Sequence, residues 1–198
     1  MKIRNLYRFT ELSPEAQATA IKAEVASRRS DSELPWREET IDSFKSIFEK
    51  ASITLTNWEL GAYCYSSASF DMGDAGVLAG KRAFAWLENN LLGALRTPWF
   101  GPERWNVARY NYRAGSVQPC PFTGYYADDV LLECLIAKVR EGDTLKEAFA
   151  NLADETRKLL EIEVEGYTCE EAVREDLEDD PNGYYGEVFR ASGEKVVS

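Results

Sequence analysis

The sequence contains no histidine, and this absence narrows the chemistry available to the protein. Histidine is the side chain whose unperturbed pKa lies nearest to neutrality, and it is also the commonest metal ligand in proteins. Any catalysis would have to rely on carboxylates, cysteine thiols or tyrosines. The composition therefore favours a protein with no catalytic residues, no cofactor and no bound metal.

Cysteine pairs and long apolar runs are also lacking. The four cysteines, Cys64, Cys120, Cys134 and Cys169, include no CxxC motif, which predicts reduced thiols and no disulfide framework. No apolar run approaches the roughly 18 residues of a membrane-spanning helix. The N-terminal residues do not have the pattern of a secretory signal. We expect a cytoplasmic protein that binds no membrane.

Acidic residues are what the sequence has in excess, with a formal net charge of −11. Between Asp154 and Asp180, twelve carboxylates face only Arg157, Lys158 and Arg174, so this segment has a net charge of −9. Such a field repels nucleic acid and attracts basic surfaces, which predicts a basic, nucleic-acid-binding protein as the partner. The predicted partner-binding residues are Asp154, Glu155, Glu161, Glu163, Glu165, Glu170, Glu171, Glu175, Asp176, Glu178, Asp179 and Asp180.

The periodicity of the chain predicts one α+β domain over residues 1–198, with about five helices packed on a small, mostly antiparallel sheet. Helices are expected over residues 14–27, 36–50, 78–96 and 127–140. The acidic segment is expected on two further helices, which begin at the capping boxes Thr144/Glu147 and Thr168/Glu171. The sheet is expected to combine a hairpin over residues 53–70, a strand over 107–112 and a closing hairpin over 184–197.

The charge density of the acidic segment limits what it can imitate. Its twenty-seven residues would span about 40 Å as one continuous helix, which gives one net charge per roughly 4.5 Å. Duplex DNA carries one charge per ~1.7 Å. A single helix is therefore too sparse to copy a duplex, although folding the two helices together or pairing two protomers would raise the density. The alternative interpretation is that these acids are the solvated faces of two amphipathic helices.

Five residues outside the acidic segment support an enzyme alternative, a carboxylate- or thiol-based hydrolase or transferase. Cys120 precedes the helix that begins near residue 127, where a helix N-terminus favours a thiolate, but Asp128 and Asp129 oppose the negative charge. Asp71 and Asp74 lie in a glycine-containing turn and are candidate cation ligands, although Asp also suits turns for its own hydrogen bonding. This alternative predicts that all five residues meet in one pocket.

Three stretches of the sequence together resemble a known group of proteins. They are Tyr7-Arg8-Phe9-Thr10-Glu11-Leu12-Ser13, Leu78-Ala79-Gly80-Lys81-Arg82-Ala83 through Asn90, and Cys120-Pro121-Phe122-Thr123-Gly124-Tyr125-Tyr126-Ala127-Asp128-Asp129. The set resembles a family of uncharacterised accessory proteins encoded by phages and prophages. The resemblance implies a phage accessory gene expressed in the cytoplasm of a bacterial host, and it supplies no catalytic residues. It favours an anti-defence inhibitor, of the DNA-mimic kind or a stoichiometric blocker, over the remaining alternative of an acidic structural phage protein.

Overall fold

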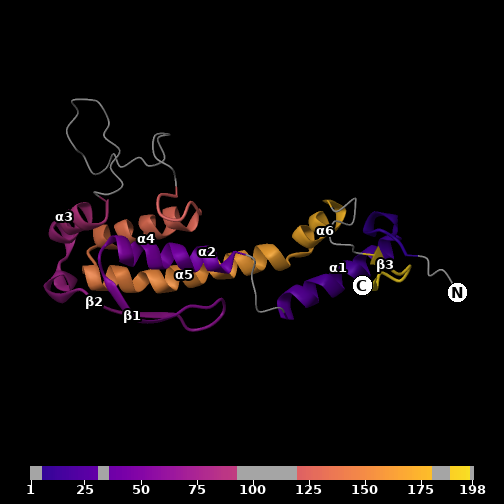
Figure 1. The fold of residues 1–198 in the computed structure, drawn as a ribbon, viewed down its shortest axis with the longest axis horizontal. Coiled ribbons are helices and arrows are strands. Elements are labelled where there is room, and N and C mark those ends of the chain that lie inside the picture. Colours follow the sequence, from indigo (N-terminus) through magenta and orange to yellow (C-terminus); the bar gives the residue numbers. More distant parts are fainter. Residues whose placement is uncertain (1–5, 31–35, 93–119, 180–187, 197–198) are drawn as a thin grey trace, which may run out of the picture. The chain divides into compact units, whose positions relative to one another are not determined.

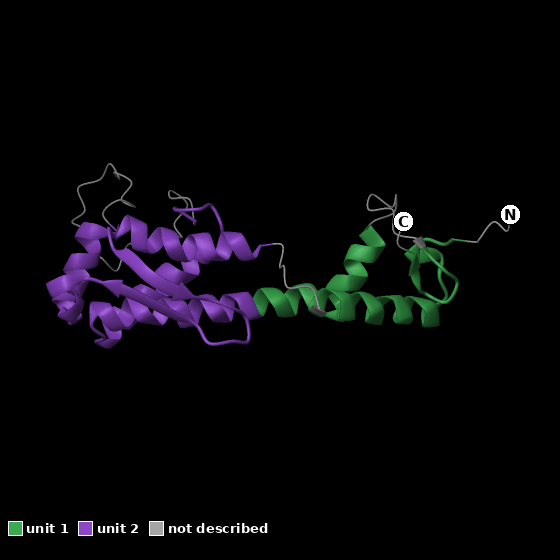
Figure 2. Cartoon of the chain, turned by 60° about the horizontal axis from the view of Figure 1, so that its bottom comes forward, with its two compact units in different colours: residues 1–34, 162–198 green, residues 35–161 purple. Residues whose placement is uncertain are grey.

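The computed structural model describes residues 6–30, 36–92, 120–179 and 188–196, and within them it confirms an α+β fold (Figure 1). The chain divides into two compact units (Figure 2). Residues 1–34 and 162–198 form unit 1, and residues 35–161 form unit 2. The single domain expected from the length of the chain stays a prediction, since two compact units can still unfold in one transition.

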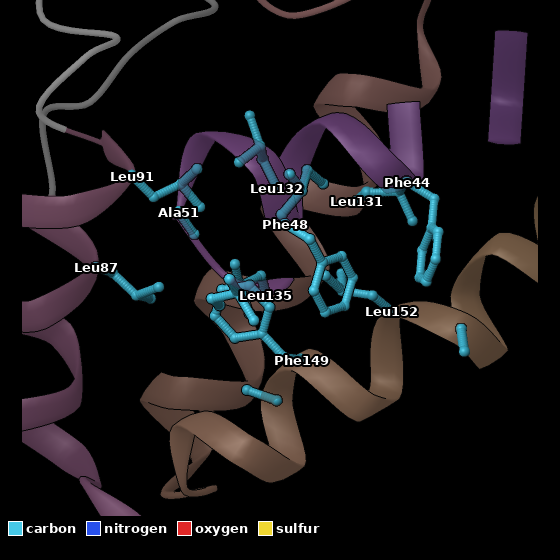
Figure 3. Close-up of a cluster of buried hydrophobic side chains, with 14 of the residues drawn as sticks. Phe44, Phe48, Ala51, Leu87, Leu91, Leu131, Leu132, Leu135, Phe149 and Leu152 are labelled. Carbon is cyan, nitrogen blue, oxygen red and sulfur yellow. The ribbon is translucent and has the colours of Figure 1, made fainter. Parts of the chain in front are cut away.

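Unit 2 is built from helices that enclose an aromatic and aliphatic core. The helices are α2 (Arg37–Lys50), α3 (Gly80–Asn90), α4 (Ala127–Glu141) and the first part of α5 (Leu145–Thr168). Phe48 of α2 and Phe149 of α5 are fully buried, with ring centroids 5.3 Å apart and the rings edge to face (Figure 3). Such aromatic pairs stabilise a core beyond the area that they bury.

An antiparallel hairpin completes the core of unit 2. Strands β1 (Thr54–Glu59) and β2 (Ser67–Asp71) pair with an irregularity between Leu55 and Asn57. Phe70 of β2 packs against Phe48, with ring centroids 5.1 Å apart. The 3₁₀ helix η2 (Gly73–Val77) follows, and the Leu145 N–H then donates to the Leu78 carbonyl at 2.8 Å. This bond places η2 beside the turn between α4 and α5.

Unit 1 has its own smaller core. Its elements are the 3₁₀ helix η1 (Phe9–Glu11), α1 (Pro14–Ser30), the end of α5, α6 (Glu170–Asp179) and the strands β3 (Val188–Phe189) and β4 (Lys195–Val196). Ser13 accepts a hydrogen bond from the Ala16 N–H, which confirms it as the N-cap of α1. Phe9, Ile21, Val173 and Phe189 are buried together, so α1 and α6 share one apolar interior.

Two details of the predicted sheet and helices differ from the structure. Among the residues that the structure describes, the two hairpins form two separate two-stranded sheets, one in each unit, whereas the sequence predicts a single sheet. The strand expected over 107–112 lies outside the described residues. The capping box at Thr144 and Glu147 is confirmed by reciprocal bonds of 2.8 and 3.3 Å. The box at Thr168 is wrong, because its hydroxyl donates to the Val164 carbonyl within α5, and Cys169 accepts the Ala172 N–H instead.

Candidate acidic interface

Helix α6 presents an ordered row of carboxylates on unit 1. Glu170 and Glu171 lie in its first turn, where they complement the positive end of the helix. Val173 and Leu177, one turn apart, are buried against the core of unit 1, and this fixes which face of the helix meets solvent. The exposed acids of the helix are Glu170, Glu171, Glu175, Asp176, Glu178 and Asp179.

Arg28 of α1 holds this helix in place. Its guanidinium contacts Asp176 of α6 at 2.8 Å, Glu24 at 3.2 Å and the backbone carbonyl of Tyr167 near the end of α5 at 3.0 Å. The same group lies over the Tyr167 ring, 4.4 Å from its centroid. Burial opposes the charged form of Arg28, but the hydrogen bonds to Asp176 and Glu24 outweigh this effect and raise the pKa of the guanidinium. Lys195 of β4 also contacts Glu24, at 3.2 Å.

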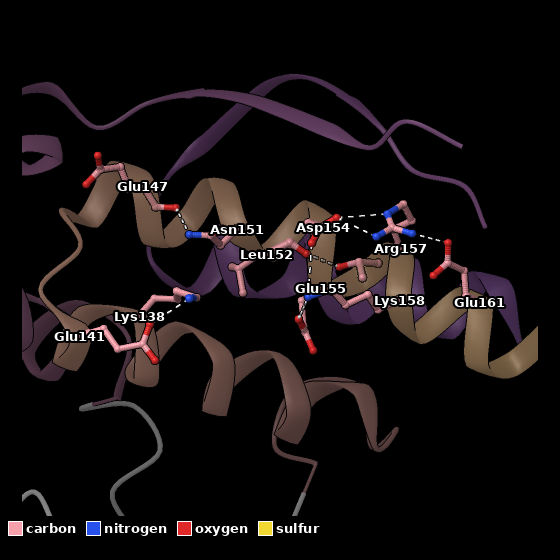
Figure 4. Close-up of polar contacts among 11 residues, drawn as sticks. Lys138, Glu141, Glu147, Asn151, Leu152, Asp154, Glu155, Arg157, Lys158 and Glu161 are labelled. Atoms are coloured by element: carbon pink, nitrogen blue, oxygen red, sulfur yellow. Dashed lines mark hydrogen bonds and ion pairs between the residues drawn. The ribbon is translucent and has the colours of Figure 1, made fainter. Parts of the chain in front are cut away.

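The acids of α5 within unit 2 are locally neutralised. Asp154 contacts Arg157 at 3.0 Å and Lys158 at 3.3 Å, Glu155 contacts Lys158 at 3.1 Å, and Arg157 also pairs with Glu161 (Figure 4). Burial alone would raise the pKa of Asp154, but the hydrogen bonds from Arg157 and Lys158 hold it below its usual range. These three of the twelve predicted residues therefore present little net charge to a partner.

The remaining predicted residues belong to unit 1. Glu165 is exposed at the end of α5, whereas Glu163 is buried, with 9 % of its surface accessible, and Asp180 lies outside the described residues. By sequence, unit 1 holds sixteen acidic and nine basic residues, a net charge of −7, and unit 2 holds the other −4. The structure thus concentrates the accessible acid on α6 and does not spread it over all twelve positions.

The five residues of the enzyme alternative do not meet in one pocket. Asp71 and Asp74 lie at the end of β2 and in η2, and both are exposed. This region adjoins the turn after α4, whereas Asp128 and Asp129 lie in the first turn of that helix and Cys120 precedes it. Fifteen residues of helix separate the two ends, a distance on the order of 20 Å.

The chemistry of these side chains also argues against an activated nucleophile. Burial raises the pKa of the Cys120 thiol, and the nearby carboxylates Asp128 and Asp129 raise it further. Asp71 accepts a hydrogen bond from the Gly73 N–H at 2.8 Å, as expected for an Asp in a turn. Among the described residues, no three His, Cys, Asp or Glu side chains gather closely enough to hold a metal ion.

Sequence reasoning missed Arg28 altogether. Its neighbour Arg29 is the same residue type on the same helix, and the local sequence separates the two only by Glu24, four residues before Arg28. The partners Tyr167 and Asp176 lie more than a hundred positions away along the chain. No helical period or capping motif links such positions, so only the tertiary structure shows that Arg28 contacts α5 and α6.

Comparison with known proteins adds no identification. No protein-family model matches the chain, and no curated protein or solved structure is significantly similar to it. None of the helices in the described ranges combines the length and apolar content required to cross a bilayer.

Proposed function

We propose that the protein is a non-catalytic, phage-encoded binding protein that occludes the basic, nucleic-acid-binding surface of a host defence or nucleic-acid enzyme. The phage origin rests on the sequence resemblance alone. The single observation that supports the binding role is α6, whose acids are exposed while Val173 and Leu177 anchor the helix in the core of unit 1. Carboxylates held at set positions are what recognition of a particular basic surface requires.

The arrangement of charge on α6 favours steering and occlusion over close imitation of a duplex. At 100° per residue, Glu171, Glu175, Glu178 and Asp179 fall within an arc of about 100°, opposite the buried side. The helix has six acids and one base over about 15 Å, so it carries one net charge per roughly 3 Å. This is denser than the whole acidic segment but remains about half the charge density of duplex DNA.

The placement of two acids argues against a purely solvating role. Glu178 and Asp179 lie in the last turn of α6, which contains no basic residue. Negative charge at a helix C-terminus opposes the helix dipole, so these positions lower the stability of the helix. Solubility alone would be served equally well by acids elsewhere on the surface. An acidic binding face explains why they stand at this end.

The test compares two triple variants with the same change in formal charge. The first, Glu175→Gln, Glu178→Gln and Asp179→Asn, neutralises the outward face of α6. The control, Glu49→Gln, Glu59→Gln and Asp74→Asn, neutralises three exposed acids of unit 2. A partner is captured from host lysate at low salt, purified, and titrated with each protein. We expect the α6 variant to bind at least tenfold more weakly than the control, with the difference shrinking as salt screens the charges.

Occlusion is tested with the same partner. Wild-type protein should displace the partner from duplex DNA, and the α6 variant should fail to do so at equal concentration. Equal losses of affinity in both triple variants would mean that net charge alone matters and that α6 is not the interface. Unchanged affinity in both, with only solubility reduced, would support the alternative of an acidic structural protein.

A further inference from the structure

The start of α4 contains a fully buried carboxylate that the proposed function does not use. Asp128 lies in the first turn of the helix and has no accessible surface. Its Oδ2 accepts the backbone N–H groups of Phe122 and Thr123 at 2.8 and 2.7 Å, and its Oδ1 accepts the Thr123 hydroxyl at 3.0 Å. Three donors from one short segment therefore surround a single carboxylate.

The network continues from this segment to α2. The Thr123 hydroxyl has one proton, which it donates to Asp128, because an ionised carboxylate only accepts hydrogen bonds. The buried Ser43 hydroxyl of α2, 3.0 Å from the Thr123 hydroxyl, must then be the donor of that second bond. The Tyr125 N–H also donates to the Thr123 hydroxyl, at 3.2 Å. Asp128 thus ends a chain of hydrogen bonds that joins α2, the segment before α4 and α4 itself.

Burial of a charge in this place is tolerated only while the segment stays closed. A carboxylate without partners in a protein interior is strongly unfavourable, whereas three charge-assisted hydrogen bonds and the positive end of a helix offset the loss of water. Opening of residues 120–126 would remove the three donors together. The segment and the carboxylate are therefore coupled: opening the segment destabilises the buried carboxylate, and removing the carboxylate destabilises the closed segment.

We propose that Asp128 is an internal anionic ligand that clamps residues 120–126 closed, and that this clamp keeps the Cys120 thiol covered and unreactive. Cys120 is half-buried and lies two residues before the first N–H that the carboxylate holds. In the closed state, burial and the neighbouring charges also raise the pKa of the Cys120 thiol, and this lowers its reactivity as well. Release of the clamp would expose a free cysteine on unit 2.

The experiment follows two signals in the full-length protein, amide hydrogen exchange of residues 120–126 and alkylation of each cysteine by iodoacetamide, both resolved by mass spectrometry. Asp128→Ala removes the clamp, and Asp129→Ala is the control, since it removes a charge near Cys120 but none of the described bonds to Phe122 and Thr123. Cys134, half-buried along α4, serves as the internal reference for labelling.

We expect Asp128→Ala to speed exchange at Phe122 and Thr123 and alkylation of Cys120 at least tenfold, because each hydrogen bond to a charged group shifts such an equilibrium by about that factor. Asp129→Ala should leave the exchange as in wild type and change Cys120 labelling only a few-fold. Sodium formate should slow both signals in Asp128→Ala and in no other protein. The clamp is refuted if both alanine variants behave alike or formate gives no protection.

Loss of folding in Asp128→Ala would not count as support for the clamp. Asp128→Asn keeps the volume and one accepting oxygen of the side chain but loses its charge. If Asp128→Ala does not fold, the comparison passes to Asp128→Asn and Asp129→Asn. Faster exchange at Phe122 and Thr123 in Asp128→Asn alone supports the clamp, and equal exchange in the two proteins overturns it.

Discussion

Replacement of Arg28 by methionine should loosen unit 1 without removing any acid. The side chain of Arg28 is only 10 % exposed, and methionine keeps much of its apolar length. The variant loses the bond to the Tyr167 carbonyl, worth about 1.5 kcal/mol for a charged donor. It also loses the pair with Asp176, which is 60 % exposed and so contributes at most about 1 kcal/mol. The contact with the Tyr167 ring adds about 0.5 kcal/mol.

Together these losses predict that α6 and the Tyr167 end of α5, opening as one piece from α1, do so about 2–3 kcal/mol more easily. Native-state hydrogen exchange of α6 measures this directly, and the protection factors of its amides should fall by roughly 30- to 150-fold. Arg29→Met is the matched control, because Arg29 is exposed and has the same charge. Its effect should stay within about 0.5 kcal/mol. Equal protection of α6 in the two variants would refute the role given to Arg28.

The same variant separates positioned charge from total charge in the proposed binding function. Arg28→Met makes unit 1 more negative by one charge. If only net charge draws the basic partner, the affinity should rise slightly, as it should in Arg29→Met. If the partner requires α6 in its place, the affinity of Arg28→Met should fall while that of Arg29→Met does not. A titration at low salt with the purified partner distinguishes these results.

Three further perturbations test the fold. Bonds from the backbone and hydroxyl of Thr144 lower the pKa of Glu147, so their contribution to stability is present above about pH 4.3 and is lost as pH falls through the lower folded-state pKa. In Glu147→Gln, the unfolding free energy measured with urea should therefore fall less steeply at acid pH than in wild type. An unchanged pH dependence would contradict this. Gly193→Ala would bring a Cβ within 2.1 Å of the Ala16 carbonyl oxygen, which should destabilise unit 1. Gly124→Ala in unit 2 is the control and should cost less, because Gly124 has a similar φ but open space around it. Equal losses of stability in thermal denaturation would exclude the clash. Phe149→Ala should cost about 3–5 kcal/mol of unfolding free energy, and a loss below about 1 kcal/mol would mean that the aromatic core is not as packed as Figure 3 shows.

Much of the helical structure could be predicted because its signals are local. Ser13 and Pro14 begin α1, and Thr144 with Glu147 begins α5, since a cap needs only residues a few positions apart. The same kind of signal misled at Thr168. The Thr168 hydroxyl can either accept a backbone N–H of the next helix or donate to a carbonyl of the helix before it. It donates to the Val164 carbonyl, because α5 continues as far as Thr168.

The sequence alone determined that the chain lacks histidine chemistry, has a net charge of −11 and gathers acids on amphipathic helices, because these properties depend on residue identity and on spacings of three or four. Arg157 and Lys158 pair with the acids of α5 three or four residues away, so this neutralisation is also local. Tertiary structure decided which face of α6 meets solvent, because Arg28 and the buried pair Val173 and Leu177 hold this helix with its acids outward. Contacts between residues a hundred or more positions apart depend on how whole helices pack, and no local pattern encodes that packing.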